Sequence, residues 1–529
     1  LRGGIELAIN YEKGLLKVDQ LVGEKLSQHL MEGELIIPED KPEIAKILDL
    51  GARVYGTGIE VVQDKVMVEG IICYNLLYIP VGDNKTVVQV DSDEAFTQYV
   101  EVEGAKPRMN ADITFELEHV DYDIQDSRSL NIRTVLNIGC KVQQLLQLEV
   151  LRQFEEQDTI QALRQPLRLI SSAGDGRGQT IIREDVEIPD DMPSAVEVLR
   201  KDARVRILER KVADNRVVAH GEVELRLLYQ TQEEQDPIQF LQYEIPFSHA
   251  VEVQGAYQGM DCHVNVEAQD IDISLREDIV GDVRILSVDM MLFMEARVYE
   301  SHEVDVIVDA YSPGSVLELT KEKIVLTHSI GEAQVQTVIR ENIEVPENMP
   351  PVDRILYVEV RPLIADYRIN EDQVLVDGVL TGVVLYKPEN DELPISSIKV
   401  DIPFSQGLEI VGVTEDMDCF CEVELQYLSH TLVSLNEFEL KATLLVRGEA
   451  TQSIEKEVLL DIEEKELDIE EDSGLYIYFV QPGDTLWSVA KKYNTTINSI
   501  LKYNDIADQD VLEAGTKLII FKRLDTSIA

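Results

Sequence analysis

The sequence predicts a mainly β protein: three tandem antiparallel β-sandwich-like repeat domains, followed by a small domain of β-α-α-β order. Three features predict this architecture: a long internal repeat, alternation of apolar and polar residues within each copy, and helical periodicity confined to the C-terminal stretch. We expect β domains at 1–150, 163–312 and 321–465, an acidic linker at 461–475, and the small domain at 476–523.

The repeat rests on six positions that recur with the same spacing. The second copy follows the first by 151 residues, and the third follows the second by 157 residues. Because the spacing is the same at all six positions, the copies have almost no net insertion relative to one another. We therefore expect the three copies to share one fold. The recurring residues are Gly23, Gly174 and Gly331; Pro38, Pro189 and Pro346; Gly70, Gly221 and Gly378; Tyr78, Tyr229 and Tyr386; Phe96, Phe247 and Phe404; and Met109, Met260 and Met417.

Each copy shows the alternation of half-buried strands. In the second copy Val223 and Leu225 alternate with Glu222 and Glu224, and the third copy repeats this pattern over 422–427. A strand with one apolar and one charged face is typical of an antiparallel sheet that is buried on one side only. This alternation predicts that each copy packs two such sheets face to face.

The charge of the chain restricts its partners. The net charge is −52, whereas the stretch 476–523, with six Lys or Arg and five Asp or Glu, is close to +1. An acidic surface repels phosphate groups, so we expect neither nucleic-acid binding nor membrane insertion. No long apolar run predicts a transmembrane helix. The chain has no signal-peptide pattern, and its start at Leu1 rather than Met leaves a native N-terminal leader open.

Five cysteines, an odd number without a dense framework, predict reduced thiols. Cys419 and Cys421 lie two residues apart in a predicted strand, so we expect both to point to one face. No histidine or second cysteine pair completes a metal site there, and we expect no metal and no cofactor.

The C-terminal stretch combines short strands and short helices. Tyr476, Tyr478 and Val480 alternate as in a strand, and Leu518 and Ile520 do so near the end of the chain. Between them, apolar residues at helical spacing predict two helices over 486–493 and 497–501. We expect Asp484 to cap the first helix and Thr496 to cap the second.

The motif Val480-x-x-Gly-Asp-Thr-Leu-Trp487, with the later Asn504-Asp505-Ile506 step, resembles the LysM domain. The resemblance implies binding of glycans that contain N-acetylglucosamine, such as peptidoglycan, in a groove between two loops. The residues that it places in the groove are Gly483, Asp484, Thr485, Leu486, Asn504, Asp505 and Ile506. The alternative is that these residues cap helices and fill a small core. For Trp487 we favour a core role over a sugar platform.

The repeats also resemble a known domain. Ile188-Pro-Asp-Asp-Met-Pro193, its counterpart Val345-Pro-Glu-Asn-Met-Pro350, and the Ile-Pro-Phe-Ser steps at Ile245 and Ile402 are similar to the SPOCS domain of spore-coat proteins. Three such copies followed by one LysM-like domain are similar to a family of clostridial spore coat morphogenetic proteins. The resemblance implies a non-enzymatic role at the forespore surface in the mother-cell cytoplasm and then in the coat. It implies binding to a coat-scaffold ATPase or other coat proteins, with the LysM-like domain contacting protein rather than glycan.

An acidic run separates the last repeat from the small domain. Residues Asp461 to Asp472 contain eight acids and one lysine, which favours a solvated tether over the alternative of a charged edge strand. A tether would let the small domain move relative to the β domains.

No catalytic constellation occurs in the sequence: it has no H-E-x-x-H, P-loop or G-x-S-x-G motif. The absence of such motifs and the repeated β domains favour an assembly protein, and the SPOCS resemblance implies that it acts in the spore coat. It would dock partners and self-associate into homo-oligomers or filaments through exposed sheet edges. The alternative is an extracellular or cell-wall protein anchored on peptidoglycan by its C-terminal domain. A wall hydrolase is disfavoured, because no stretch remains for a catalytic domain.

Overall fold

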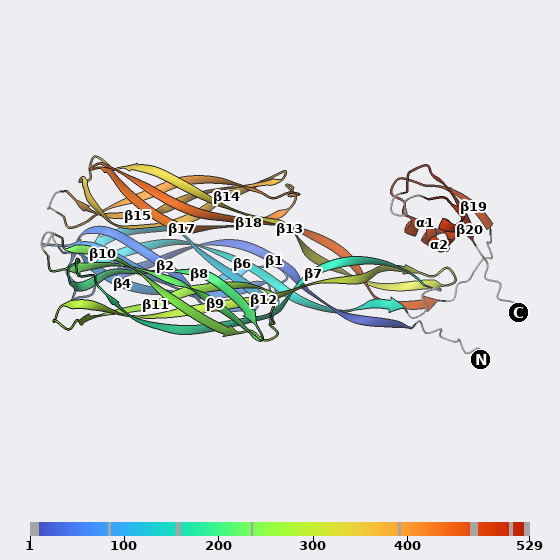
Figure 1. The fold of residues 1–529 in the computed structure, drawn as a ribbon, viewed down its shortest axis with the longest axis horizontal. Coiled ribbons are helices and arrows are strands. Elements are labelled where there is room, and N and C mark those ends of the chain that lie inside the picture. The colour runs from blue at the N-terminus through green and yellow to red at the C-terminus, as the bar shows by residue number, and fades with distance from the viewer. Residues whose placement is uncertain are drawn as a thin grey trace.

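The computed structural model describes residues 10–82, 86–154, 160–233, 236–389, 393–465, 474–506 and 512–522. Within these ranges it has twenty strands and two short helices, both near the C-terminus. The predicted mainly β architecture is therefore confirmed. Figure 1 shows three elongated β bodies side by side at one end of the molecule and the small domain at the other end.

Each repeat copy consists of six strands. The first copy contains β1 (Tyr11–Ile36), β2 (Ile44–Val62), β3 (Lys65–Pro80), β4 (Val88–Glu101), β5 (Asn110–Asp126) and β6 (Ser129–Phe154). The second contains β7 (Gln161–Glu187), β8 (Ala195–Ala213), β9 (Arg216–Thr231), β10 (Ile238–Glu252), β11 (Asp261–Glu277) and β12 (Val283–Tyr311). The third contains β13 (Val316–Glu344), β14 (Val352–Asn370), β15 (Gln373–Pro388), β16 (Ser396–Glu409), β17 (Asp418–Ser434) and β18 (Glu437–Lys465).

The six strands of a copy form two three-stranded antiparallel sheets. In the first copy the orders are β1-β6-β5 and β2-β3-β4, and the other two copies repeat both orders. The inward faces of the two sheets share one apolar core, which in the second copy includes Val223, Leu225 and Leu292. The alternation seen in the sequence thus places one face of each sheet in a sandwich core, as predicted.

The recurring tyrosines and glycines have the same role in every copy. The hydroxyls of Tyr78, Tyr229 and Tyr386 donate to the carbonyls of Pro42, Pro193 and Pro350, at 2.7, 3.1 and 2.9 Å, and so fasten the loop between the first two strands. Each glycine of the set Gly70, Gly221 and Gly378 lies beneath the ring of the recurring phenylalanine, where an added Cβ would meet the ring and a backbone oxygen.

We expect Gly221→Ala to destabilise the second copy by about 1–3 kcal/mol, because the new methyl group would force the ring of Phe247 or the strand backbone to move. The Cβ would lie 2.2 Å from the carbonyl oxygen of Arg206 and 2.8 Å from the ring. The measurement is the midpoint of urea unfolding. Gly314→Ala is the control, because no atom lies within 4 Å of a Cβ at that position. Equal midpoints for the two variants would contradict this account.

The first and last strands of each copy are unusually long. The six strands β1, β6, β7, β12, β13 and β18 have 26–29 residues each, and they continue past the bodies toward the small domain. Their extensions share an apolar core made by Leu16, Val150, Leu167, Val304, Ile324 and Val458. We call this part the stalk. A register shift at each recurring glycine of the Gly23 set marks the place where a long strand leaves the body and enters the stalk.

Equivalent residues of the three bodies also meet in one apolar cluster. It contains Leu48, Leu199 and Leu356, which hold one repeat position, and Leu77, Leu228 and Leu385, which hold another. Contact among the same positions of all three copies describes an approximate three-fold arrangement. The three bodies therefore pack against one another around a shared apolar interface and do not form a linear row of separate domains.

Beside this cluster lies a buried polar network, in which one repeat position carries a different residue in each copy: Asp49, Arg200 and Tyr357. Arg200 is only 4% exposed. Its Nη2 donates to Asp49 Oδ2 at 2.6 Å, its Nε donates to Asn75 at 3.1 Å, and its guanidinium lies over the Tyr357 ring at 5.6 Å. The three copies thus form ionic and aromatic contacts with one another because each carries a different residue at this repeat position.

Arg226 and Asp202 extend the network. Asp202 pairs with Arg53 of the first copy and with Arg226, and Arg226 donates to the carbonyl of Val358 in the third copy. Burial raises the pKa of Asp202, but the charges of Arg53 and Arg226 outweigh it, so that pKa is lowered overall. Three copies that all carried arginine, or all carried aspartate, at the Arg200 position would bring like charges together, so the network depends on the difference between the copies.

The predicted linker begins inside the fold. Residues Asp461–Lys465 are the end of β18, where they pair with Val316–Thr320 of β13. This part is a strand rather than a tether, although β18 is the middle strand of its sheet and not the edge strand of the alternative. Residues 466–473 of the predicted tether lie outside the described residues. Cys419 and Cys421 do point to one face, as expected, with their sulfurs 3.6 Å apart.

Candidate functional site

The C-terminal domain has the predicted β-α-α-β order. It contains β19 (Gly474–Phe479), α1 (Leu486–Lys492), α2 (Ile497–Tyr503) and β20 (Lys517–Lys522), with the two strands antiparallel. One face of the strand pair packs on both helices through a core that includes Leu486, Val489, Ile500, Leu518 and Ile520. The apolar spacing in the sequence therefore places the two helices on one side of a two-stranded sheet.

The predicted cap of the second helix is confirmed, and that of the first is wrong by one residue. Thr485, not Asp484, caps α1: its hydroxyl accepts from the Ser488 amide, and Ser488 Oγ accepts from the Thr485 amide. Such a reciprocal pair satisfies two amides that the helix leaves free. Thr496 caps α2 by accepting from the Ser499 amide at 3.0 Å.

Asp484 instead closes the turn before α1. Its carboxylate accepts from the Tyr478 hydroxyl at 2.6 Å and from the Gln481 amide at 2.8 Å. These two hydrogen bonds lower the pKa of Asp484, the one from Tyr478 most. Gly483, within the same turn, has φ of 88°, a conformation that favours glycine. Asp484 therefore has a structural role, whatever else it contacts.

Three more of the predicted groove residues are also used within the domain. Asn504 donates to the carbonyls of Ile500 and Ile519 at 2.8 Å and accepts from the Ile519 amide at 2.7 Å, which fastens α2 to β20. Leu486 is buried, and Ile506 packs against the same core. Leu486 and Ile506 therefore both contribute to the domain core, and the exposed groove residues are Gly483, Thr485 and Asp505.

A second contact surface of the domain faces the stalk. Trp487 Nε1 donates to Asp309 Oδ2 at 2.9 Å, and Lys491 Nζ lies 2.7 and 2.6 Å from the two oxygens of the same carboxylate. The Tyr311 ring packs edge-on against Trp487 with ring centres 4.9 Å apart, and its hydroxyl donates to the carbonyl of Thr495 at 2.7 Å. We call this contact the latch. Trp487 packs against the domain core, as expected, and also contacts the stalk.

The electrostatics of the latch favour a charged Asp309. Burial raises the pKa of Asp309, but hydrogen bonds from Lys491 and Trp487 and the nearby charge of Lys321 outweigh it, so that pKa is lowered. Burial also raises the pKa of Tyr311, which therefore stays a neutral donor. The latch thus holds helix α1 against the end of β12 by a partly buried ion pair and an aromatic contact.

The outer face of the β19–β20 pair carries apolar side chains that sequence reasoning missed. Leu475 pairs with Phe521 across the strands, and Ile477 pairs with Ile519. Together with Phe479 and Tyr503, they form a surface that we call the head face. The signal was present, because 475–480 is apolar at every position, as a strand with two apolar faces would be.

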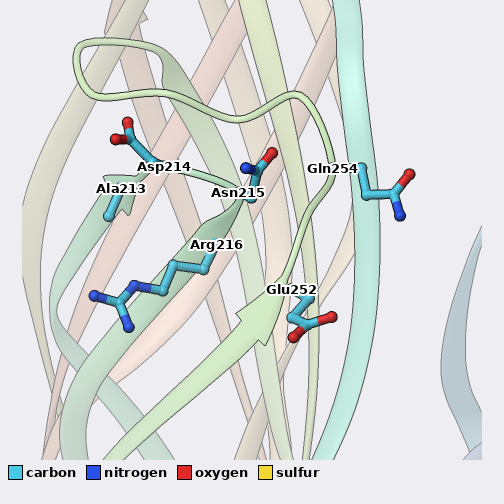
Figure 2. A pocket seen from close by; sticks show the side chains of 6 residues that line it. All are labelled: Ala213, Asp214, Asn215, Arg216, Glu252 and Gln254. Carbon is cyan, nitrogen blue, oxygen red and sulfur yellow. The ribbon is translucent and has the colours of Figure 1, made fainter.

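Among the described residues, the bodies carry a hollow at one end of the second copy. The hollow in Figure 2 surrounds the β8–β9 turn and is lined by Ala213, Asp214, Asn215, Arg216, Glu252 and Gln254, whose side chains diverge. Asn215 accepts from the Gly255 amide at 3.1 Å, and Asp64 and Asp372 make the same bond in the other copies, so it closes a repeated turn. No cluster of three metal-ligating side chains occurs among the described residues. Neither seven-residue helix of the described chain is long enough to span a bilayer.

Two family models match the chain. The model described as SipL, SPOCS domain matches residues 43–125, 194–276 and 351–433, and the LysM domain model matches 478–521. Each SPOCS match covers the four strands that lie between the first and the last strand of a copy, which are β2 to β5 in the first copy. The matches exclude the long strands that form the stalk. No curated protein and no solved structure matches. The chain therefore carries three SPOCS domains of the SipL type followed by one C-terminal LysM domain.

Proposed function

We propose that this protein is a non-enzymatic assembly protein of the bacterial spore coat. Its three SPOCS domains form one rigid unit, and its LysM domain, the head, docks a partner at the forespore surface. The partners are the coat-scaffold ATPase or other coat proteins, and self-association into homo-oligomers or filaments extends the assembly. The protein acts in the mother-cell cytoplasm at the forespore surface and then in the coat.

The observation that carries this proposal is the latch. A flexible anchor needs no specific contact with the stalk, whereas the pairs of Asp309 with Trp487 and Lys491 fix one orientation of the head. A head held in one orientation suits an assembly in which each protein must meet its neighbour at a defined angle. The divergent side chains of the hollow at the β8–β9 turn give no support to a catalytic role.

The test is the position of the tagged protein in sporulating cells of the source organism. We expect the full chain to collect at the forespore surface and a chain ending at Lys465 to remain dispersed. The control is Asp505→Ala in the full chain, which leaves the head folded because the described structure gives Asp505 no role in the core. A full chain dispersed through the mother cell would contradict the proposal.

A second function, binding of peptidoglycan, is favoured by the exposure of Gly483, Thr485 and Asp505 on the LysM domain. It would place the protein outside the cell or in the cell wall. If it is right, wild-type protein should sediment with purified sacculi. Asp505→Ala should weaken this retention severalfold, whereas Thr485→Ser, which preserves the helix cap, should keep the domain folded. Loss of wild-type retention at all protein concentrations would exclude this function.

A further inference from the structure

We propose that the protein assembles head to tail, with the head face of one molecule docked on the hairpin tips at the far end of the next molecule's bodies. The inference rests on the self-association part of the proposed function and names the surfaces that carry it. The evidence for this inference is that the head face and the hairpin tips are both apolar, carry opposite charges around them and lie at opposite ends of the molecule.

The head face is a compact apolar surface. Leu475, Ile477, Phe479, Phe521 and Tyr503 are 42–59% exposed, although each is large and apolar or aromatic. The rings of Tyr503 and Phe521 are in tilted contact, with ring centres 4.4 Å apart, so the surface is continuous across strand and helix. The latch leaves it free, because α1 faces the stalk and the head face lies on the other side of the sheet. Soluble proteins rarely expose such a patch unless it binds something.

The far end of the bodies carries the second apolar surface, which we call the tail tips. In the β11–β12 hairpin, Ile279 and Val280 are 104% and 80% exposed, and they lie next to each other. Asp278 fixes this turn by accepting from the amides of Val280, Gly281 and Asp282 at 2.8–3.0 Å. The corresponding hairpins of the other bodies expose Ile124, Val433 and Leu435.

The two ends also differ in charge. Lys502 and Lys517 flank the head face, both exposed, and neither joins an ion pair within the described chain. At the tail tips, the cations Lys41 and Arg128 are paired with Glu197 and Glu43, and Arg284 donates to the carbonyl of Pro189 and lies near Asp278. Exposed acids that join no ion pair in the described ranges surround them; these are Glu39, Asp40, Asp190 and Asp191. A lysine-flanked apolar face therefore fits an acid-flanked apolar end, and this chain supplies both.

The shape of the molecule favours an open assembly. Figure 1 places the head and the hairpin tips at opposite ends of the long axis. A contact between two different surfaces continues from molecule to molecule and gives a filament if it does not close into a ring. End-to-end contact also keeps most of the net charge of −52 per molecule farther apart than the screening length of about 10 Å. Side-by-side contact would bring the acidic bodies together.

The test uses purified full-length protein and measures its mass by light scattering over a range of concentrations, with electron microscopy of the product. The head variant is Ile477→Ser with Phe479→Ser, and the tail variant is Ile279→Ser with Val280→Ser. All four side chains are exposed, so both variants should fold. Leu208→Ser, at an exposed leucine of β8 away from the tips, is the matched control.

We expect the wild type and the control to grow into filaments with concentration and each variant to stay monomeric. A mixture of the two variants should stop at heterodimers, because one intact head then meets one intact tail. A monomeric wild type overturns the inference, as does a tail variant that assembles like the wild type. If the wild type is monomeric but still collects at the forespore surface, the self-association part of the proposed function fails, its docking part stands, and the head face contacts another protein.

Discussion

Arg200→Ala is expected to lower the free energy of unfolding by about 3–5 kcal/mol, because it leaves a buried carboxylate without its cation. Asp49 is 10% exposed in its side chain, and water cannot replace the 2.6 Å contact that Arg200 makes with it. In the same change Asn75 loses a hydrogen-bond donor, and Glu359 loses an ion-pair partner at 3.6 Å. Because these partners come from the first and third copies, the loss should separate the bodies rather than unfold one of them.

The measurement is denaturant unfolding followed by circular dichroism, with a double-mutant cycle on Asp49 and Arg200. The cycle should give a coupling energy of about 2–3 kcal/mol for residues in direct contact. Arg206→Ala is the control, since its pairs with Glu222 and Glu244 are solvent-exposed and worth at most about 1 kcal/mol. An effect of Arg200→Ala no larger than that of Arg206→Ala would show that the network does not hold the bodies together.

The same network predicts the response to acid. The folded-state pKa of Asp202 is lower than the ordinary value of 3.8, so its contribution is complete above that value. The contribution is lost as pH falls through the lower, folded-state pKa. We therefore expect the bodies to stay associated from pH 7 down to about 5 and to separate only in stronger acid. Small-angle scattering over a pH series would measure this, and separation near pH 6 would contradict it.

The sequence predicts those parts of the fold that depend on residues repeated in all three copies. The six repeated positions predict three copies of one fold. The structure explains two of these positions directly: the hydroxyl of Tyr78 and its equivalents donates to a proline carbonyl, and Gly70 and its equivalents leave room for a phenylalanine ring. The alternation predicts the sandwich because a strand buried on one side needs period two. The β-α-α-β order follows from apolar spacing in the same way.

What could not be predicted depends on contacts between copies and between domains. Asp49, Arg200 and Tyr357 differ at one repeat position, so a search for shared residues passes over them, and the stalk arises from strands that are longer than any local pattern requires. The sequence predicts Asp484 as the cap of α1, whereas the structure has Thr485 there. Both residue types cap helices, and only the geometry of the turn decides between them. Asp309 and Trp487 are 178 residues apart, and no local signal links them.

The latch gives the second large expected effect. Asp309→Ala should weaken docking of the head by about 1.5–3 kcal/mol, because Trp487 and Lys491 lose hydrogen bonds to a charged group. That change lowers the ratio of docked to undocked molecules roughly tenfold to a hundredfold. Trp487 is the single tryptophan of the chain, so its fluorescence reports the latch without a label.

Undocking should shift the emission of Trp487 to longer wavelength, because the indole leaves Tyr311 and enters water. Asp305→Ala is the matched control, an exposed carboxylate on the same strand. Since the folded-state pKa of Asp309 is lowered from 3.8, wild-type emission should stay constant from neutral pH to about 5 and shift only in stronger acid. Tyr311→Phe, which removes only the hydroxyl bond to Thr495, should give a smaller shift than Asp309→Ala. If Asp309→Ala leaves the emission unchanged, the ion pair does not fix the head, and its orientation must depend on the aromatic contact alone.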